Sequence, residues 1–317
     1  MTAVDVAINV YGKPFQTAVT LLSLVKHSGT HIGKIYFVVE PKQPRRENFQ
    51  FLFELLGDRL AIHTPKYWHW YKPSEAANYH DGDYRRSIRY QFAWEMSDAN
   101  YLYITHNDVL YMGDIVGAFL ENIGGCVGIG HVGMCWNCPA HKSGMCGREK
   151  YFQYRPTYDE VMDLARRYPP PRGADYSAHI DETNPWPLPE CRLNEWAALV
   201  DMRLARPLTV PIGDAPPLGA MGLDIGTQWF RAMSLTGLRF QNYNFYHLAR
   251  HGWTADEPNG HSANFNEDLY ENGEVMARET LIRDLGVSAA MLPRAGKRTW
   301  KRVLTLLREM TTDGPRA

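Results

Sequence analysis

Residues 101–120 read YLYITHNDVLYMGDIVGAFL, and this stretch decides the fold. Its first five residues are the apolar, aromatic and β-branched types of a buried strand, which ends directly in His106, Asn107 and Asp108. Open α/β sheets bind their ligands at the carboxyl ends of the strands. The pattern therefore predicts that Asp108 lies where a carboxylate can hold a divalent metal or meet a diphosphate. A carboxylate that only caps the next loop is the alternative.

The first hundred residues alternate short β-rich runs with helical ones, which is typical of a parallel sheet covered by helices. We expect strands at 4–10, 34–39, 59–63 and 101–105, and helices from Pro14, at 46–56 and at 84–96. Farther on, the pattern predicts a strand at 126–133, a helix starting near Leu193, a helix at 225–235 ended by Gly237, and a strand-like run at 238–246.

These elements predict one α/β domain over residues 1–280, interrupted by a cysteine-containing insertion at 134–191. Residues 281–317 form the tail. Its segment 298–310, RTWKRVLTLLREM, has an apolar face and basic residues elsewhere, which indicates an amphipathic helix.

Composition excludes several classes of protein. The chain has 317 residues and a net charge of −1, so it lacks the basic excess of a nucleic-acid-binding protein. It contains no run of about 18 apolar residues, and Met1 leads straight into a strand pattern without the charged start of a signal peptide. We therefore expect a cytoplasmic protein. Five cysteines indicate reduced thiols or a metal site rather than a disulfide scaffold.

The stretch 101–120, with Gly222-Leu223-Asp224 downstream, resembles inverting GT-A glycosyltransferases, especially family 2. The resemblance covers roughly residues 4–130 and 218–262. It implies a GT-A-like, Rossmann-related sheet, mostly parallel and flanked by helices. It also implies transfer of a sugar from a nucleotide-diphosphate donor to an acceptor hydroxyl, with inversion and with Asp224 as general base. Asp108 would hold Mn²⁺ or Mg²⁺, or the diphosphate itself.

Two positions depart from that family. His106 stands where the first Asp of its DxD motif is expected, and Leu223 stands where a Glu precedes the catalytic Asp. His106 could ligate a transition metal, hydrogen-bond a phosphate, or mark a transferase that works without metal. We expect His106 and Asp108 to bind a divalent metal.

The resemblance places the nucleoside at the ends of the first two strands, near Val10, Tyr11 and Glu40. On the helix predicted at 84–96, Arg85 and Arg89 lie four residues apart and would share a face suited to a diphosphate. An acid at the protein surface and a row of solvated arginines are the structural alternatives.

Histidines near the carboxyl end supply a further ligand candidate. His247 and His251 have an H-x₃-H spacing, which places both on one face if the segment is helical. GT-A transferases often supply a late histidine to the metal or diphosphate, and His247 matches that pattern best. His251 and His261 are alternatives, as are ordinary loop histidines.

Four of the five cysteines fall in or at the end of the predicted insertion. Cys135, Cys138, Cys146 and Cys191 include one C-x₂-C pair, which is the spacing that wraps two sulfurs around one ion. We expect a structural Zn²⁺ site that offsets the loop entropy of the insertion. Free buried thiols and an iron–sulfur cluster are the alternatives.

Three other functions compete with glycosyl transfer as interpretations of the sequence. A sugar nucleotidyltransferase would need a glycine-rich basic loop after the first strand, where residues 11–14 have one Gly and one Lys. A catalytically silent nucleotide-sugar-binding protein would fit the changes at His106 and Leu223. A zinc hydrolase is disfavoured because no H-E-x-x-H motif occurs. The acceptor would be a glycan or a lipid-linked molecule, and the basic tail could contact the inner face of a membrane.

Overall fold

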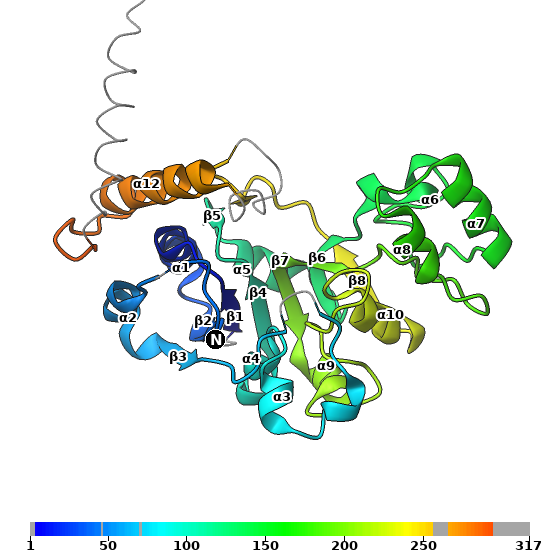
Figure 1. Cartoon of the computed structure of the whole chain (residues 1–317), viewed down its shortest axis with the longest axis horizontal. Coiled ribbons are helices and arrows are strands. Elements are labelled where there is room, and N and C mark those ends of the chain that lie inside the picture. Colours follow the sequence, from blue (N-terminus) through cyan, green and yellow to red (C-terminus); the bar gives the residue numbers. More distant parts are fainter. Residues whose placement is uncertain (1–3, 46, 70–71, 256–265, 294–317) are drawn as a thin grey trace, which may run out of the picture.

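The computed structural model describes residues 4–45, 47–69, 72–255 and 266–293 (Figure 1). Its main sheet has seven strands in the order β3-β2-β1-β4-β7-β6-β8, and only β7 runs antiparallel to its neighbours. These strands are β1 (Val4–Val10), β2 (Ile32–Val39), β3 (Leu60–His63), β4 (Tyr101–Thr105), β6 (Gly128–Val132), β7 (Leu193–Asp201) and β8 (Phe240–Asn242). The predicted α/β class, with a mostly parallel sheet flanked by helices, is confirmed.

Two hydrophobic cores cover the two faces of the sheet, because strand side chains alternate between faces. In β4, Leu102 and Ile104 join one core and Tyr103 joins the other. The first core contains residues of α4 (Gln91–Met96), α7 (Tyr158–Arg167), α8 (Gly173–Ala178), α9 (Met202–Thr209) and α10 (Thr227–Leu235). The second contains residues of α1 (Pro14–Ser28), α2 (Gln50–Leu56), α5 (Ile115–Asn122) and α12 (Glu267–Arg283).

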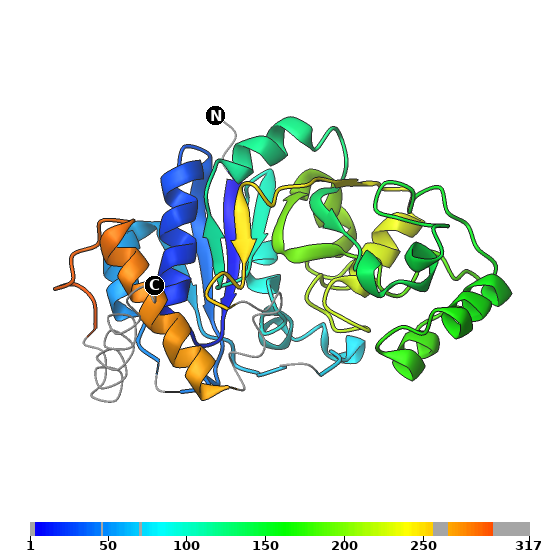
Figure 2. The ribbon, with the colours of Figure 1, turned by 90° about the horizontal axis from the view of Figure 1, so that it is seen from above.

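Helix α12 lies along α1, far from it in sequence but beside it in space (Figures 1 and 2). The sequence pattern did not predict this helix.

Two other predicted helix ends are confirmed. Helix α1 begins at Pro14, and Gly237, with a left-handed φ of 88°, lies two residues after the end of α10. Helix α2 is shorter than predicted, since it begins at Gln50.

The helix predicted at 84–96 is wrong. The structure has two short helices there, α3 (Gly82–Arg86) and α4, separated by Tyr90 in the left-handed region with φ 66°. Asn9, near the end of β1, accepts a hydrogen bond of 2.9 Å from the Tyr90 backbone N–H through its Oδ1 atom. A helix cannot pass through a residue in that conformation. Arg85 and Arg89 therefore do not share a helix face.

The helix predicted from Leu193 is also wrong, because residues 193–201 form β7, in which every residue is buried. Apolar residues three and seven positions apart, such as Leu193, Trp196 and Val200, imitate helical spacing. A strand buried on both faces has no polar side to give it an alternating pattern. The helix of this region, α9, starts one residue after β7 ends.

A second sheet of two strands joins β5 (Val109–Tyr111) to β9 (Ala249–His251) in antiparallel register. In this register Val109 pairs with His251, which brings a late segment of the chain next to the end of β4. Of the run predicted as strand-like at 238–246, only Phe240–Asn242 is a strand. The segment with the H-x₃-H spacing is not helical, because His247 lies in a turn and His251 ends β9, so the two histidines do not share a helix face.

Residues 134–191 contribute no strand to either sheet. They carry α6 (Pro139–Lys142), α7 and α8, with one short 3₁₀ turn at Cys135–Asn137, and these helices gather at the β8 side of the sheet (Figure 1). The remaining 3₁₀ turns are Gly57–Arg59 and Ala76–Asn78. The domain boundaries and the status of 134–191 as an insertion stay predictions.

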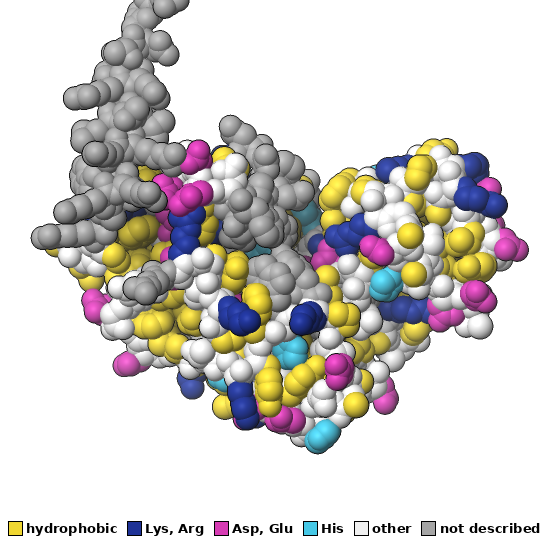
Figure 3. All heavy atoms as spheres, viewed as in Figure 1, with side chains coloured by type: hydrophobic (Ala, Val, Ile, Leu, Met, Phe, Trp, Pro, Cys, Tyr) yellow, Lys and Arg dark blue, Asp and Glu magenta, His cyan; other side chains and the backbone are white. Residues whose placement is uncertain are grey.

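On the face that Figure 3 displays, Lys and Arg side chains are scattered among acidic and apolar ones. This mixture agrees with the small net charge of the chain. Within the described ranges, no helix is both long and apolar enough to span a bilayer. The amphipathic helix predicted at 298–310, and with it the expected membrane contact, falls outside the described residues.

Candidate active site

A His–Asp–His group lies where the main sheet meets the small one. His106 and Asp108 follow β4 directly, and His251 ends β9. His106 Nδ1 lies 3.1 Å from His251 Nε2, and that nitrogen lies 3.2 Å from Asp108 Oδ1. Among the residues that the structure describes, these three form the one group of at least three His, Cys, Asp or Glu side chains whose ligand atoms lie within 4.8 Å of one another.

The spacing of this group suits a divalent cation. Adjacent ligands of an octahedral ion, each about 2.1 Å from the metal, are about 3 Å apart. Asp108 Oδ1 is buried and accepts no hydrogen bond of good geometry, although His251 lies 3.2 Å away, so a cation would satisfy this acceptor better. Two imidazoles and one carboxylate favour a transition ion such as Mn²⁺ over Mg²⁺, which prefers oxygen ligands.

Lys13 adds a positive charge on the other oxygen of the same carboxylate. Its Nζ lies 2.8 Å from Asp108 Oδ2, and both side chains are buried. Burial alone would raise the pKa of Asp108, but Lys13 and His251 hold that pKa well below its usual range. The β1–α1 loop is fixed here because Asn107 Nδ2 donates to the carbonyl of Gly12 at 3.1 Å.

Glu195 extends the group toward β7. Its Oε1 atom lies 3.4 Å from His106 Nε2, and its side chain is buried on the antiparallel strand. Arg192 reaches the other oxygen, with 4.0 Å between its Nε and Glu195 Oε2. Burial raises the pKa of Glu195, but Arg192 and His106 lower it more strongly, so the carboxyl is ionised at neutral pH.

Arg192 also connects this group to Asp224. Arg192 Nη1 and Arg172 Nη2 each lie 2.8 Å from Asp224 Oδ2, and the backbone N–H of Ile225 donates to Oδ1 at 2.8 Å. The Asp224 side chain is about one-fifth exposed at 19%. A series of polar contacts therefore joins Asp108 to Asp224 through His251, His106, Glu195 and Arg192. That the two acids serve one site stays a prediction.

The residues expected to hold the nucleoside lie at the ends of β1 and β2. Glu40 is buried; its Oε1 accepts a hydrogen bond of 3.2 Å from Asn9 and lies 3.8 Å from Arg89 Nε. Burial raises the pKa of Glu40, while Arg89 and Asn9 lower it. Tyr11 is half-buried close to Glu40. Val10 is fully buried, and its carbonyl already accepts hydrogen bonds from the Glu40 N–H and from Gln43 Nε2, so the structure does not support the expected contact of Val10 with a ligand.

Arg85 pairs with Glu95 and does not contact the residues expected to hold the nucleoside. Its guanidinium forms a bidentate pair with Glu95, at 2.5 Å and 3.2 Å, and donates to the carbonyl of Tyr79. Since the side chain is buried against these partners, the structure does not support the expected diphosphate contact. Arg89, which faces Glu40, is the one of the two arginines that remains near the predicted nucleotide site.

The other residues predicted as metal ligands do not join the His–Asp–His group. His247 is exposed and lies outside the His–Asp–His group, where His251 takes the place expected for it. His261 falls outside the described residues. Cys135, Cys138, Cys146 and Cys191 line a pocket of their own.

The sequence reasoning missed Lys13, Glu195 and Arg192 as site residues. Glu195 had a usable signal, since an acid inside the apolar run LNEWAALVD must be paired if the run is buried. Lys13 had a weaker one, its place directly after a buried strand and before Pro14. Nothing in the sequence connects Arg192 with Asp224.

No protein-family model matches the chain, and no curated protein sequence does. Solved structures do match. A mannosyltransferase of Pyrobaculum calidifontis, solved with GDP-mannose and Mn²⁺, is 9% identical, with 98% of this chain and 81% of that chain covered and a TM-score of 0.42. Mouse xyloside xylosyltransferase 1 is 14% identical, with 77% and 85% covered and a TM-score of 0.39.

Glucosyl-3-phosphoglycerate synthase of Mycobacterium tuberculosis, solved with Mn²⁺, UDP and phosphoglyceric acid, is 9% identical, with 87% of this chain and 78% of that chain covered and a TM-score of 0.42. These three structures are glycosyltransferases by name. Because identities and scores are this low, we transfer neither a residue role nor an activity from them.

Proposed function

We propose that this protein is a glycosyltransferase that moves a sugar from a nucleotide-diphosphate donor to an acceptor hydroxyl with inversion. The observation that carries the proposal is the group of His106, Asp108 and His251 at the carboxyl end of a central parallel strand, with Lys13 beside it. That end of a sheet is where α/β proteins bind nucleotides. A divalent cation held by the group would neutralise the charge that develops on the leaving diphosphate.

The chain's own residues supply the rest of the donor site. The ammonium of Lys13, buried at the start of α1, puts a second positive charge next to Asp108. Glu40 offers a buried carboxylate to a base or ribose at the end of β2, with Tyr11 beside it. Arg89 is close enough to Glu40 to position that carboxylate.

Asp224 is proposed as the general base. It takes the proton of the acceptor hydroxyl while the acceptor oxygen bonds to the anomeric carbon and the bond from that carbon to the diphosphate breaks. Three donors already contact the carboxylate, which leaves one of its four lone-pair positions for the acceptor hydroxyl. Of the two arginines, Arg172 leaves the easier approach, because its side chain is 33% exposed whereas that of Arg192 is 9% exposed.

Replacement of Asp224 tests this role. We expect Asp224→Asn to lower turnover by about 10²- to 10⁴-fold, since the amide keeps the shape of the side chain but cannot accept the proton. The assay follows nucleoside diphosphate released from a panel of nucleotide sugars with Mn²⁺ and glycan or lipid-linked acceptors.

Asp163→Asn is the matched control, because Asp163 also lies between two arginines, Arg166 and Arg167, but on the surface of α7. Its turnover should equal that of the wild type. Wild-type turnover by Asp224→Asn would remove Asp224 as the base.

The products separate the rival functions. A sugar nucleotidyltransferase would consume a nucleoside triphosphate and release pyrophosphate, whereas a silent binding protein would bind the donor and release nothing. Release of nucleoside diphosphate that depends on an acceptor supports the glycosyltransferase alone.

A further inference from the structure

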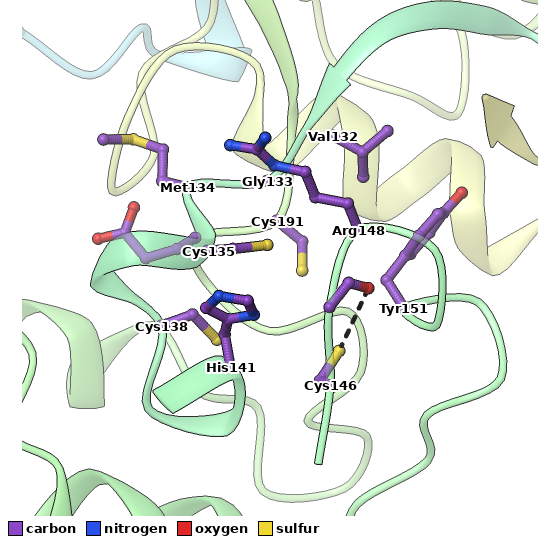
Figure 4. A pocket seen from close by; sticks show the side chains of 12 residues that line it. Val132, Gly133, Met134, Cys135, Cys138, His141, Cys146, Arg148, Tyr151 and Cys191 are labelled. Atoms are coloured by element: carbon purple, nitrogen blue, oxygen red, sulfur yellow. Dashed lines mark hydrogen bonds between the residues drawn. The ribbon is translucent and has the colours of Figure 1, made fainter. Parts of the chain in front are cut away.

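Four cysteine side chains from three separate segments face one small pocket (Figure 4). Cys135 and Cys138 come from the 3₁₀ turn after β6, Cys146 from the loop after α6, and Cys191 from the residues just before β7. The pocket has a cavity volume of about 10 Å³, which is room for a single ion or atom and not for an organic ligand. His141, Arg148 and Tyr151 are among the other residues that line it.

The backbone holds these thiols near one another without any help from the thiols themselves. The N–H of Cys138 donates to the carbonyl of Cys135 at 3.1 Å, which closes the C-x₂-C turn. The N–H of Cys146 returns to the carbonyl of Ala140 at 3.1 Å, and that of Cys191 donates to the carbonyl of Leu188 at 2.8 Å. The loop is therefore folded back on itself and docked against the start of β7.

From this arrangement we infer that Cys135, Cys138, Cys146 and Cys191 bind one structural Zn²⁺ ion as thiolates, releasing their protons to solvent. Thiolates are the ligands that zinc prefers in structural sites, and four of them complete its tetrahedral shell. All five cysteines of the chain are free thiols in the structure, so none of the four is used in a disulfide. No three of these sulfurs lie within 4.8 Å of one another, so the ion would draw them inward by side-chain rotation.

The charge around the pocket supports an anionic cluster. Zinc with four thiolates carries a net charge of −2, and burial of that charge requires a nearby cation. Arg148 lines the pocket together with Cys135, and its guanidinium brings a positive charge close to that thiol. Glu190 also lines the pocket, and burial raises the pKa of its carboxyl against the lowering effect of Arg172 and Arg192.

A zinc ion here would fasten the segment that positions Asp224. Arg192 is next to Cys191, and its carbonyl accepts a hydrogen bond of 2.6 Å from the N–H of Gly133. The N–H of Met134 likewise donates to the carbonyl of Glu190 at 3.1 Å. Both ends of the 134–191 segment therefore meet beside the guanidinium that contacts Asp224, and the ion would tie them together.

The first test measures metal in the full-length protein, produced with zinc in the medium and purified without chelator. We expect about one equivalent of zinc, and protection of four of the five thiols from a thiol reagent until the protein is unfolded. Less than about a tenth of an equivalent, with all thiols reactive in the native protein, would overturn the proposal. Iron with acid-labile sulfide, or disulfides found by mass spectrometry, would also overturn it.

Single variants then assign the ligands. Cys135→Ser and Cys146→Ser should each lose most of the zinc, whereas Cys126→Ser should keep it, because Cys126 is a half-buried thiol outside the pocket. His141→Ala should keep it as well. Loss of zinc from His141→Ala together with full retention in Cys146→Ser would replace the four-cysteine site by one with a histidine ligand.

Cobalt substitution covers the case in which the serine variants do not fold. In wild-type protein, Co²⁺ exchanged for zinc should give the thiolate charge-transfer bands and the visible absorption of a tetrahedral site. A spectrum of octahedral Co²⁺ without thiolate bands would contradict the assignment. Neither result depends on glycosyl transfer, so this proposal and the proposed function can fail separately.

Discussion

Asp108 uses its two carboxylate oxygens for different partners. Oδ2 meets the ammonium of Lys13, and Oδ1 faces the imidazole of His251 without a hydrogen bond of good geometry. The lysine stabilises the buried carboxylate before any ligand arrives, because an unpaired charge in this place would be costly. The second oxygen stays available for a cation, so one residue serves both folding and binding.

The histidine at the end of β9 should decide metal affinity. We expect His251→Ala to weaken Mn²⁺ binding by at least about tenfold, because the variant removes one of three ligand atoms that lie within 4.8 Å of one another. Isothermal titration of the full-length protein with MnCl₂ measures the change.

His247→Ala is the matched control, since His247 is exposed and only four residues upstream. Its Mn²⁺ affinity should equal that of the wild type. Weaker binding by His247→Ala with normal binding by His251→Ala would restore the ligand set predicted from the sequence.

At this scale the sequence predicted residues that lie beside a recognisable element. Asp108 was predicted from its place after a strand, and Asp224 from the resemblance of Gly222-Leu223-Asp224 and the following helix to a family motif. His251 could not be preferred over His247, because the choice depends on the pairing of β9 with β5, which are more than a hundred residues apart. Arg192 could not be found for the same reason, since its partner comes from another part of the fold.

At the scale of elements, α12 caps the start of α1. Glu274 of α12 accepts hydrogen bonds from the backbone N–H groups of Phe15 and Gln16, at 2.9 Å and 3.1 Å. Those N–H groups have no partner inside their own helix, so α12 supplies the cap that the sequence around α1 lacks. The same pair of helices therefore fixes the loop that carries Lys13.

This cap predicts a dependence of stability on pH. Burial raises the pKa of Glu274 from 4.5 to about 7, against the lowering effect of Phe15 and Gln16 and with a further rise from Glu47. Between these two values the folded state binds more protons than the unfolded state, so the free energy of unfolding falls as pH rises from about 5 to 7.

Urea unfolding at pH 5, 6, 7 and 8 measures the effect. Glu274→Gln cannot ionise, so its unfolding midpoint should fall less over this range than that of the wild type. Glu279→Gln changes an exposed acid on the same helix and should keep the wild-type dependence. Equal slopes for Glu274→Gln and the wild type would show that Glu274 keeps an ordinary pKa.

The elements that sequence patterns predicted well are those whose burial follows a simple period. Strand β1 and helix α1 each have one environment along their length, and both were predicted with the right start. Strand β7 was not, because it is buried on both faces and carries Asn194 and Glu195 inside the fold. The break at Tyr90 depends on a hydrogen bond to Asn9, which no local pattern contains.

At the scale of the whole molecule, β7 connects the two halves of the site. It pairs antiparallel with β4, so its beginning lies beside the carboxyl end of that strand, where Thr105 pairs with Ala197. Glu195 is thereby brought to His106, and Arg192 to Asp224. The strand that the sequence pattern misassigned is therefore the one that joins the proposed metal site to the proposed base.

This arrangement predicts that metal and nucleotide stabilise the molecule cooperatively. A cation held by His106, Asp108 and His251 would contact the protein and the diphosphate at once, so each ligand should bind better when the other is present. A ligand at a hundred times its Kd stabilises the native state by about 2.7 kcal/mol, or a Tm rise of about 5 °C in a chain of this size. We expect the rise with Mn²⁺ and a matching nucleoside diphosphate together to exceed the sum of the two separate rises.

Variants of His251 and His247 test whether the bridging cation causes the rise in Tm beyond the sum of the two separate rises. In His251→Ala it should vanish, because the cation no longer bridges protein and diphosphate, while the effect of nucleotide alone should persist through Lys13 and Glu40. His247→Ala should keep the full excess. If the two rises simply add in the wild-type protein for every nucleotide tested, the metal and the nucleotide do not share a site, and the proposed donor site is wrong.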